Sequence, residues 1–432
     1  MRNMIFSSYK NAALAMLLSG VMALHGKQAG GNDLLRTKAA AGDAESAFYL
    51  GNEYFYGENR PANLALAVYW YKKAADKGIP EAQFNYASCL ESGRGIKKNL
   101  ADAFVWYKKA SDQNFQPASF RIAKFYLTGV PDETGRLILQ PEVKSALALL
   151  EKLTDEQYEP AEIECAAMQM GKHASAEKHK KAFTLLNRIT QRKNCDPRAL
   201  RMLGDCYFTG IGCPPDRVKA VRLLDAAAER KEPEALAKLG FLYEYGHGVK
   251  ADPEKSRDCY RKAAEAGHPM AQFKYAEAMS EGQIPGKNLN DALVWYRKSA
   301  AGECPQAIFK LGVLYYDGLG VRQNKQQAAR LFFQAARQGY ARAQYNLACL
   351  FDNGTINGKP DKEAAFYWFQ QAARGGDVIA QRRVGECYLN GTGVDQSISK
   401  AEQWLVTAAR NGDFTARELL YSIQRSAAGS SF

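Results

Sequence analysis

The histidines of this chain are the first residues to consider for chemistry, because histidine is a common general base and metal ligand. The 432 residues contain five of them: His25, His173, His179, His247 and His268. His173 and His179 are six positions apart, which places them on different sides of a helix, and no other spacing matches a metal-binding cluster. No catalytic set of serine, histidine and carboxylate can be identified in the sequence either, although distant parts of the chain could assemble one. We therefore expect no catalytic residue, no metal and no cofactor.

Glycine pairs separated by one residue could cradle a phosphate group. They occur at Gly210-Ile211-Gly212, Gly246-His247-Gly248 and Gly318-Leu319-Gly320. A phosphate loop follows a strand and ends in lysine and a hydroxyl residue, and none of these turns does so. Because the pattern recurs along the chain, it favours an architectural role at helix ends.

Nine cysteines are present, so at least one thiol is free or paired between chains. Cys89, Cys206 and Cys387 occupy one recurring apolar position, which indicates small buried residues. Three others lie in connections and could form bridges if the protein is exported: Cys195, Cys213 and Cys304.

A basic segment stands out from the formal net charge of +12. Its cations face only Glu177 and are Lys172, Lys178, Lys180, Lys181, Arg188, Arg192 and Lys193. This basic patch could meet an acidic partner, a membrane surface or an anionic polymer, or it could be a solvated helix face. Apart from Phe183, no aromatic residue interleaves with the charges as a single-strand groove requires, so we expect no nucleic-acid partner.

The first residues have the features of a secretion signal. Arg2 and Lys10 precede an apolar run of 13 residues, Ala12 to Leu24, which contains the cleavable small-residue pattern Val21-Met22-Ala23. A membrane-spanning helix needs about 20 apolar residues. We therefore expect a signal peptide at residues 1–23, no integral membrane segment once it is removed, and a periplasmic or secreted location. The location is cytoplasmic if this segment is not a signal.

The chain repeats itself with a period near 36 residues. One small residue, which we call the anchor, recurs in ten units: Gly51, Ala87, Ala123, Ala166, Gly204, Gly240, Ala276, Gly312, Ala348 and Gly385. Alanine stands five positions before the anchor in nine units, and glycine stands six positions after it in nine units. Small residues at two points of a helix let a neighbouring helix approach closely, and the glycine can end that helix in a left-handed conformation.

All five tryptophans fall on one phase of this period, about 19 residues past the anchor: Trp70, Trp106, Trp295, Trp368 and Trp404. The pattern Ala-x-x-x-Leu-Gly-x-x-Tyr-x-x-Gly-x-Gly-Val, followed by Ala-x-x-Trp-Tyr-x-Lys-Ala-Ala, resembles the Sel1-like repeat, a relative of the tetratricopeptide repeat. Close matches begin at Ala235 and at Ala307. The third unit departs from the pattern by an insertion near residues 130–140, and the fourth lacks the tyrosine and the stop glycine.

The resemblance implies an all-α fold, a right-handed α-solenoid superhelix of about ten helix-turn-helix repeats. We expect a capping segment at 24–43, the solenoid at 44–422 with a divergent unit near 155–195, and a polar tail at 423–432. The divergent region could hide a special feature or be a joint between two stacks of regular repeats.

In tetratricopeptide-like stacks the first helices line the concave face, and the resemblance places there the residue three positions before the anchor. An aromatic row occupies this position: Phe48, Phe84, Phe120, Phe273, Phe309 and Tyr345. These rings could anchor a protein or peptide ligand, or they could only pack between units. We expect an exported, non-catalytic scaffold or adaptor in a bacterial envelope. The alternative is a binder or modifier of an envelope polymer such as peptidoglycan or an anionic polysaccharide. A cell-wall-type amide hydrolase is the enzyme that the resemblance leaves open.

Overall fold

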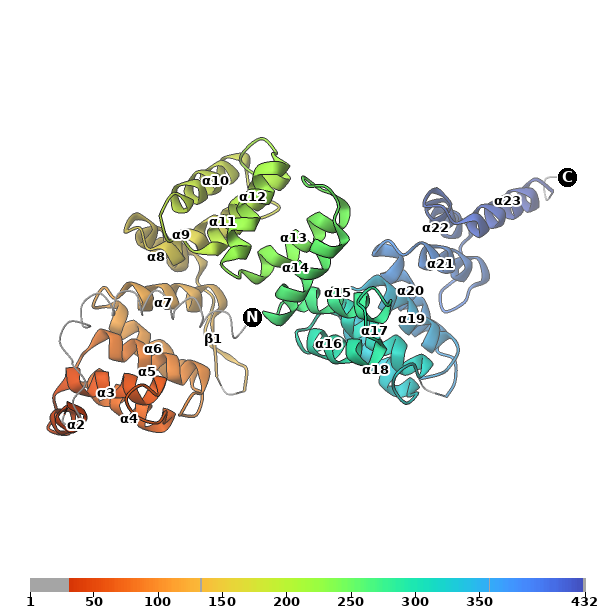
Figure 1. Ribbon diagram of the computed structural model, residues 1–432. Helices are drawn as coiled ribbons and strands as arrows, with labels where there is room; N and C mark the ends of the chain where they lie inside the picture. Colours follow the sequence, from red (N-terminus) through yellow and green to blue (C-terminus); the bar gives the residue numbers. More distant parts are fainter. Residues whose placement is uncertain (1–30, 133, 357, 430–432) are drawn as a thin grey trace. The chain divides into compact units, whose positions relative to one another are not determined.

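The computed structural model describes residues 31–429 except 133 and 357, and the expected signal peptide at 1–23 lies outside the described residues. The chain divides into two compact units after Ala220. Both units are built mainly of helices (Figure 1). The described residues form 22 helices and one short hairpin, which confirms an all-α helical repeat solenoid. Helix α12 (Arg217–Glu229) spans the division.

The helices of the two units follow one another with short connections. Those of the first unit are α2 (Gly31–Ala40), α3 (Ala44–Tyr56), α4 (Leu64–Asp76), α5 (Pro80–Ser92), α6 (Leu100–Ser111), α7 (Gln116–Thr128), α8 (Val143–Asp155), α9 (Glu159–Gln169), α10 (Ala176–Thr190) and α11 (Pro197–Thr209). Those of the second unit are α13 (Pro233–Tyr245), α14 (Pro253–Glu265), α15 (Pro269–Ser280), α16 (Leu289–Ala301), α17 (Pro305–Asp317), α18 (Lys325–Arg337), α19 (Ala341–Asp352), α20 (Lys362–Arg374), α21 (Val378–Asn390), α22 (Ile398–Arg410) and α23 (Phe414–Gly429).

Each repeat consists of an odd-numbered first helix and an even-numbered second helix. Within each unit the two helices of a repeat pack together, and the second helix also packs against the first helix of the next repeat. Helix α2 packs against the first repeat and α23 packs against the last. Helix α23 runs to Gly429, so most of the predicted polar tail continues this helix.

Local sequence signals set the helix ends. Most second helices begin at an asparagine, aspartate or serine whose side chain accepts a first-turn N–H group, as Asn63 does for α4 and Asp361 does for α20. Several first helices carry proline in the first turn, where its missing N–H group costs nothing. All nine stop glycines have a positive φ, which confirms their predicted role in ending the first helix.

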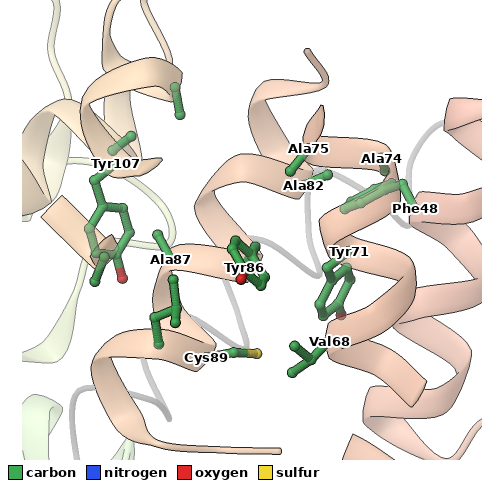
Figure 2. Packing of buried hydrophobic residues seen from close by; sticks show 14 of the residues in the cluster. Phe48, Val68, Tyr71, Ala74, Ala75, Ala82, Tyr86, Ala87, Cys89 and Tyr107 are labelled. Carbon is green, nitrogen blue, oxygen red and sulfur yellow. The ribbon is translucent and has the colours of Figure 1, made fainter. Parts of the chain in front are cut away.

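The close approach of the two helices at the anchor organises the core. A Cβ atom added to Gly51 would lie 2.6 Å from the ring of Tyr71, and one added to Gly312 would lie 2.7 Å from the ring of Phe332. These rings are fully buried and lie one residue after the tryptophan phase of the second helix. Figure 2 shows the same arrangement around Ala87, with buried rings on neighbouring helices. The small anchor therefore makes room for the largest side chain of the core.

The second glycine of the turns has a separate role in joining repeats. A Cβ atom added to Gly95 would lie 2.4 Å from the carbonyl oxygen of Leu64, and one added to Gly393 would lie 2.0 Å from that of Lys362. In each case the contacted carbonyl lies in the first turn of the preceding repeat's second helix. The architectural interpretation of the glycine pairs is therefore confirmed, since one residue ends a helix and the other lets the next repeat approach.

The two departures from the repeat pattern keep the helix-pair arrangement. The insertion in the third repeat forms an antiparallel hairpin of β1 (Val130–Pro131) and β2 (Leu137–Leu139), and Val130 is buried in the core. Helix α9 ends at Gln169 and is capped by Met170 instead of a glycine, but it still packs with α8 and α10. The division between units falls within α12 rather than in this divergent region.

A larger anchor should separate the helix pair. We predict that Gly312→Val lowers the free energy of unfolding by about 1–3 kcal/mol, because the branched side chain would overlap the Phe332 ring. Gly312→Ala is the matched control and should cost less, because Ala276 and the buried Tyr296 share one core in another repeat. Urea unfolding followed by circular dichroism measures both. Equal stability of the valine variant and the wild type would show that the anchor does not limit the helix separation.

Candidate binding surface

Half of the residues in the aromatic row are buried in the core. Phe48, Phe120 and Phe273 are buried, and Phe48 and Phe273 pack on the rings of Tyr71 and Tyr296 of their second helices. Buried rings have little surface to offer a ligand. For these three positions burial favours the alternative of packing between helices, and the binding role stays a prediction.

The other three rings of the row are half-buried. Phe84 lies between Tyr107 and Phe115, with ring centroids 5.3 and 5.6 Å away. Phe309 has the same arrangement with Phe332 and Tyr340, and Tyr345 packs on Phe369. Each of these three rings packs on a ring of its own second helix. Phe84 and Phe309 also pack on a ring at the start of the next repeat. The binding role of Phe84, Phe309 and Tyr345 stays a prediction.

The basic patch divides into paired and exposed cations. Arg188 donates to Glu162 at 2.8 Å, and Arg192 donates to both carboxylate oxygens of Glu162 at 2.5 and 3.0 Å. The Glu162 side chain is fully buried, so both arginines compensate a buried charge. The hydrogen bond to Glu162 also raises the pKa of Arg192.

The lysines of the patch are more available. Lys181 pairs with Glu177 at the protein surface. Lys172, Lys178, Lys180 and Lys193 are exposed, and within the described residues they form no ion pair with a carboxylate. The predicted patch is therefore partly a structural ion-pair cluster, and four lysines remain for an anionic partner.

Glu162 occupies a repeat position at which four other repeats have a buried glutamine. Four positions before the anchor, glutamine side chains are buried and donate from Nε2 to a carbonyl oxygen of the preceding second helix, eight residues earlier. The pairs are Gln83 with Ala75, Gln272 with Ala264, Gln344 with Ala336, and Gln381 with Ala373. Sequence reasoning missed this clamp, although glutamine after the alanine in four repeats was a visible signal.

Three repeats add a second partner to the clamp. Gln113 donates to Oε1 of Gln83 at 2.9 Å, and Asn411 donates to Oε1 of Gln381 at 2.9 Å. Both donors lie 30 residues after their acceptor, which is also the separation of Arg192 from Glu162. A carboxylate cannot donate to the carbonyl oxygen as glutamine does. The fourth repeat therefore holds a charged version of the clamp.

A polar relay links the buried tyrosines of second helices to the next repeat. Tyr107 donates to Glu91 at 2.8 Å, and Glu91 also pairs with Arg121 of the following first helix. Tyr260, Glu244 and Lys274 repeat this arrangement, with distances of 2.8 and 3.3 Å. Burial raises the pKa of both tyrosines well above its ordinary value, so each hydroxyl keeps its proton and donates. These first-helix charges serve repeat stacking.

Several described histidines and cysteines have structural contacts or are buried. His268 caps α15 through Nδ1 and contacts Glu234 at 2.9 Å through Nε2, and His179 contacts the carbonyl oxygen of Gly171. All nine cysteines are free thiols. Burial raises the pKa of Cys89 and of Cys206 to about 12, as expected for small buried residues. Residues 31–429, apart from the two gaps, contain no His, Cys, Asp and Glu group suited to hold a metal ion.

Exposed aromatic rings occur on first helices at positions that the sequence analysis did not select. On α13, Phe241 is 43% exposed and Tyr245 is 53% exposed, with ring centroids 4.8 Å apart. The ring of His247 stacks on Tyr245 at 6.1 Å. On α3, Tyr49 and Tyr56 are also exposed and lie seven residues apart on one helix face. The signal was their place one, two or five residues from the anchor, outside the recurring positions of the repeat pattern.

The charged clamp can be tested by substitution, and the amide pair of another repeat provides a model for a variant that restores it. We predict that Arg192→Met lowers the free energy of unfolding by about 1–3 kcal/mol, because buried Glu162 loses charge-assisted hydrogen bonds. The double variant Glu162→Gln/Arg192→Gln reproduces the amide pair of Gln83 and Gln113 and should recover part of this loss. Lys193→Met is the exposed control. Calorimetric melting of all three decides the matter, and an equal loss for Lys193→Met would refute the clamp.

Solved structures resemble this chain over most of its length. A protective antigen present in uropathogenic Escherichia coli strains and displaying an SLR fold is 27% identical, with a TM-score of 0.55 over 91% of this chain and 82% of that chain. A Sel1 repeat protein from Oxalobacter formigenes is 24% identical, with a TM-score of 0.48 over 95% and 92%. An immunity protein from Pseudomonas aeruginosa is 19% identical, with a TM-score of 0.36 over 50% and 82%. No curated protein matches the chain in sequence.

The family model of the Sel1 repeat matches eight segments that together make up more than half of the chain. They are residues 44–79, 80–115, 197–231, 233–268, 269–303, 305–340, 341–377 and 378–413. The unmatched stretch 116–196 contains the hairpin and the charged clamp, which are the two departures seen in the sequence. The chain therefore belongs to the Sel1 repeat family.

Proposed function

We propose that this protein is an exported, non-catalytic scaffold that binds a protein partner on the outward surface of its first helices, the concave face in related repeats. The observation that carries the proposal is the exposed pair of rings on α13, Phe241 and Tyr245. Rings exposed to this degree offer a large apolar contact at a low entropic cost. They pack on each other and on His247, so their positions are largely fixed before a partner binds.

Variation among the repeats also supports a binding role for this surface. The packing positions hold the same residue types in nearly every repeat, whereas the position after the anchor holds Asn52, Ser88, Lys124, Phe241 and Glu277, among others. A stack with a constant interior and a variable exterior can present a specific pattern of side chains without altering its fold. The rings of α3 and α13 are the apolar elements of that pattern.

The location is part of the proposal and rests on residues 1–23. Their basic start, apolar run and small residues favour export. Similarity to a protein described as a protective antigen supports a bacterial envelope or secreted location. Among the described residues, no helix has the length and apolar character to cross a bilayer.

Site-specific crosslinking tests the binding surface. A photoreactive amino acid in place of Phe241 or Tyr245 should crosslink a protein partner in the native organism, because these rings would lie in the interface. The same amino acid at Tyr69 and at Tyr367, which are equally exposed on second helices, should not. Phe241→Ala/Tyr245→Ser should retain the wild-type melting temperature and lose co-purification of the crosslinked protein. Adducts from the second-helix positions alone would contradict the proposal.

Processing of the full chain tests export. Expressed in a bacterial host with a C-terminal epitope tag, the protein should appear in the periplasm or the medium with its N-terminus at Leu24, because Val21 and Ala23 fit a signal-peptidase site. Val21→Arg/Ala23→Arg should accumulate as the uncleaved precursor, whereas His25→Ala should be processed normally. Wild-type protein that keeps Met1 in the cytoplasm would refute export.

A further inference from the structure

A basic cleft opens on the surface of the second unit, away from the exposed rings of α13. It has a volume of about 770 Å³ and is lined by Arg297 of α16, Tyr315 of α17, and residues 320–326, which lead into α18. Its three cations are Arg297, Arg322 and Lys325. All three belong to repeats with regular geometry, so this cleft is separate from the divergent fourth repeat.

Among the described residues, no carboxylate lies within ion-pair distance of the cations of the basic cleft. The segment from Arg297 to Arg342 contains eight lysine and arginine residues but only Glu303 and Asp317 as acids. In the part of the chain that the structure describes, neither the two arginines nor Lys325 forms an ion pair. The predicted basic patch differs, since its arginines are held by buried Glu162. Unpaired cations around a concavity create a positive potential that attracts anions.

Rigid elements hold the walls of the cleft. A Cβ atom added to Gly320 would lie 3.1 Å from side chains of both Leu289 and Leu293, so the turn rests directly on α16. The backbone N–H group of Asn324 donates to the carbonyl oxygen of Tyr315 at 2.8 Å, and its side chain caps α18. The positive end of α18 therefore faces the same side as Lys325 and adds to the potential.

Exposed apolar side chains that are close in sequence to the lining residues indicate the kind of anion. Val294 is 50% exposed and lies one helical turn before Arg297 on α16, and Leu319 is 53% exposed and precedes Gly320 in the turn. A polysaccharide or a polyphosphate has anionic groups but no apolar side chain to match these residues. An acidic peptide has both. Arginine also suits carboxylates, because its planar guanidinium forms two parallel hydrogen bonds with them.

We propose that the basic cleft binds an acidic segment of a protein partner, whose carboxylates contact Arg297, Arg322 and Lys325 and whose apolar side chains contact Val294 and Leu319. The proposal rests on the proposed scaffold function for its claim that the occupant is a protein. Its claim of anion recognition at this position stands on the charge and the concavity alone.

Fluorescence anisotropy with a labelled peptide of glutamate and leucine tests the cleft on the full chain at physiological ionic strength. The triple variant Arg297→Gln/Arg322→Gln/Lys325→Gln should bind this peptide at least about tenfold more weakly, because three exposed charge contacts are lost. The matched control Lys172→Gln/Lys178→Gln/Lys180→Gln removes the same charge from the other unit and should bind as the wild type does. Val294→Ser/Leu319→Ser should weaken the glutamate and leucine peptide but not a glutamate and serine peptide.

Each contrary outcome identifies its cause. An equal loss in both triple variants would mean that net charge alone governs binding and would overturn the proposal. Binding of polyphosphate or polygalacturonate that is lost with the cleft variant, without binding of the peptide, would overturn the peptide assignment and support a polymer. Crosslinking at Phe241 and Tyr245 reports on the scaffold function independently, because the cleft variants leave both rings in place.

Discussion

The approach of two helices at a single small residue is the constraint on which this fold depends. Glycine or alanine at the anchor leaves space for a tyrosine, phenylalanine or leucine from the second helix, and that side chain becomes the fully buried centre of the repeat. Interiors are close-packed, so a helix pair that meets at this distance fixes where its other side chains project. The stop glycine and the second turn glycine then return the chain to the same starting geometry. Repetition of one packing solution builds the stack.

A tyrosine that is buried at this point needs a hydrogen-bond partner, and the contacts of that partner extend to the next repeat. A buried hydroxyl needs a partner, and Glu91 and Glu244 supply one from the first helix. Each carboxylate is in turn compensated by Arg121 or Lys274 of the following repeat. The glutamine clamp does the same for the carbonyl groups at the end of a second helix. Several charges on the first helices are thus committed to stacking, which limits the surface that remains for recognition.

The basic patch differs from the basic cleft because its two arginines pair with a buried carboxylate. Arg188 and Arg192 have a buried carboxylate between them, and the fourth repeat uses this ion-pair cluster where other repeats use amides. Among the described residues, no carboxylate pairs with Arg297, Arg322 or Lys325, and these three cations line a concavity. The rings of Phe241 and Tyr245 are also exposed, and they lie outside the recurring positions of the repeat pattern. Both surfaces lie in the second unit, and they are the surfaces on which we propose that a partner binds.

The sequence by itself determined the family, the number of helix pairs, the ends of the helices and the two departures from the pattern. Periodicity reports these features directly, because glycine, alanine and tryptophan recur wherever local geometry demands them. Only the tertiary structure decided which aromatic and charged residues face solvent. Phe48 and Phe241 are both phenylalanines on first helices, but one packs on Tyr71 and the other is exposed. Arg192 and Arg322 are equally basic in the sequence, but only Arg192 has a buried carboxylate 30 residues earlier in the chain and 2.5 Å away in space. Contacts between residues distant in the sequence decide exposure and pairing, and a repeat pattern does not encode them one residue at a time.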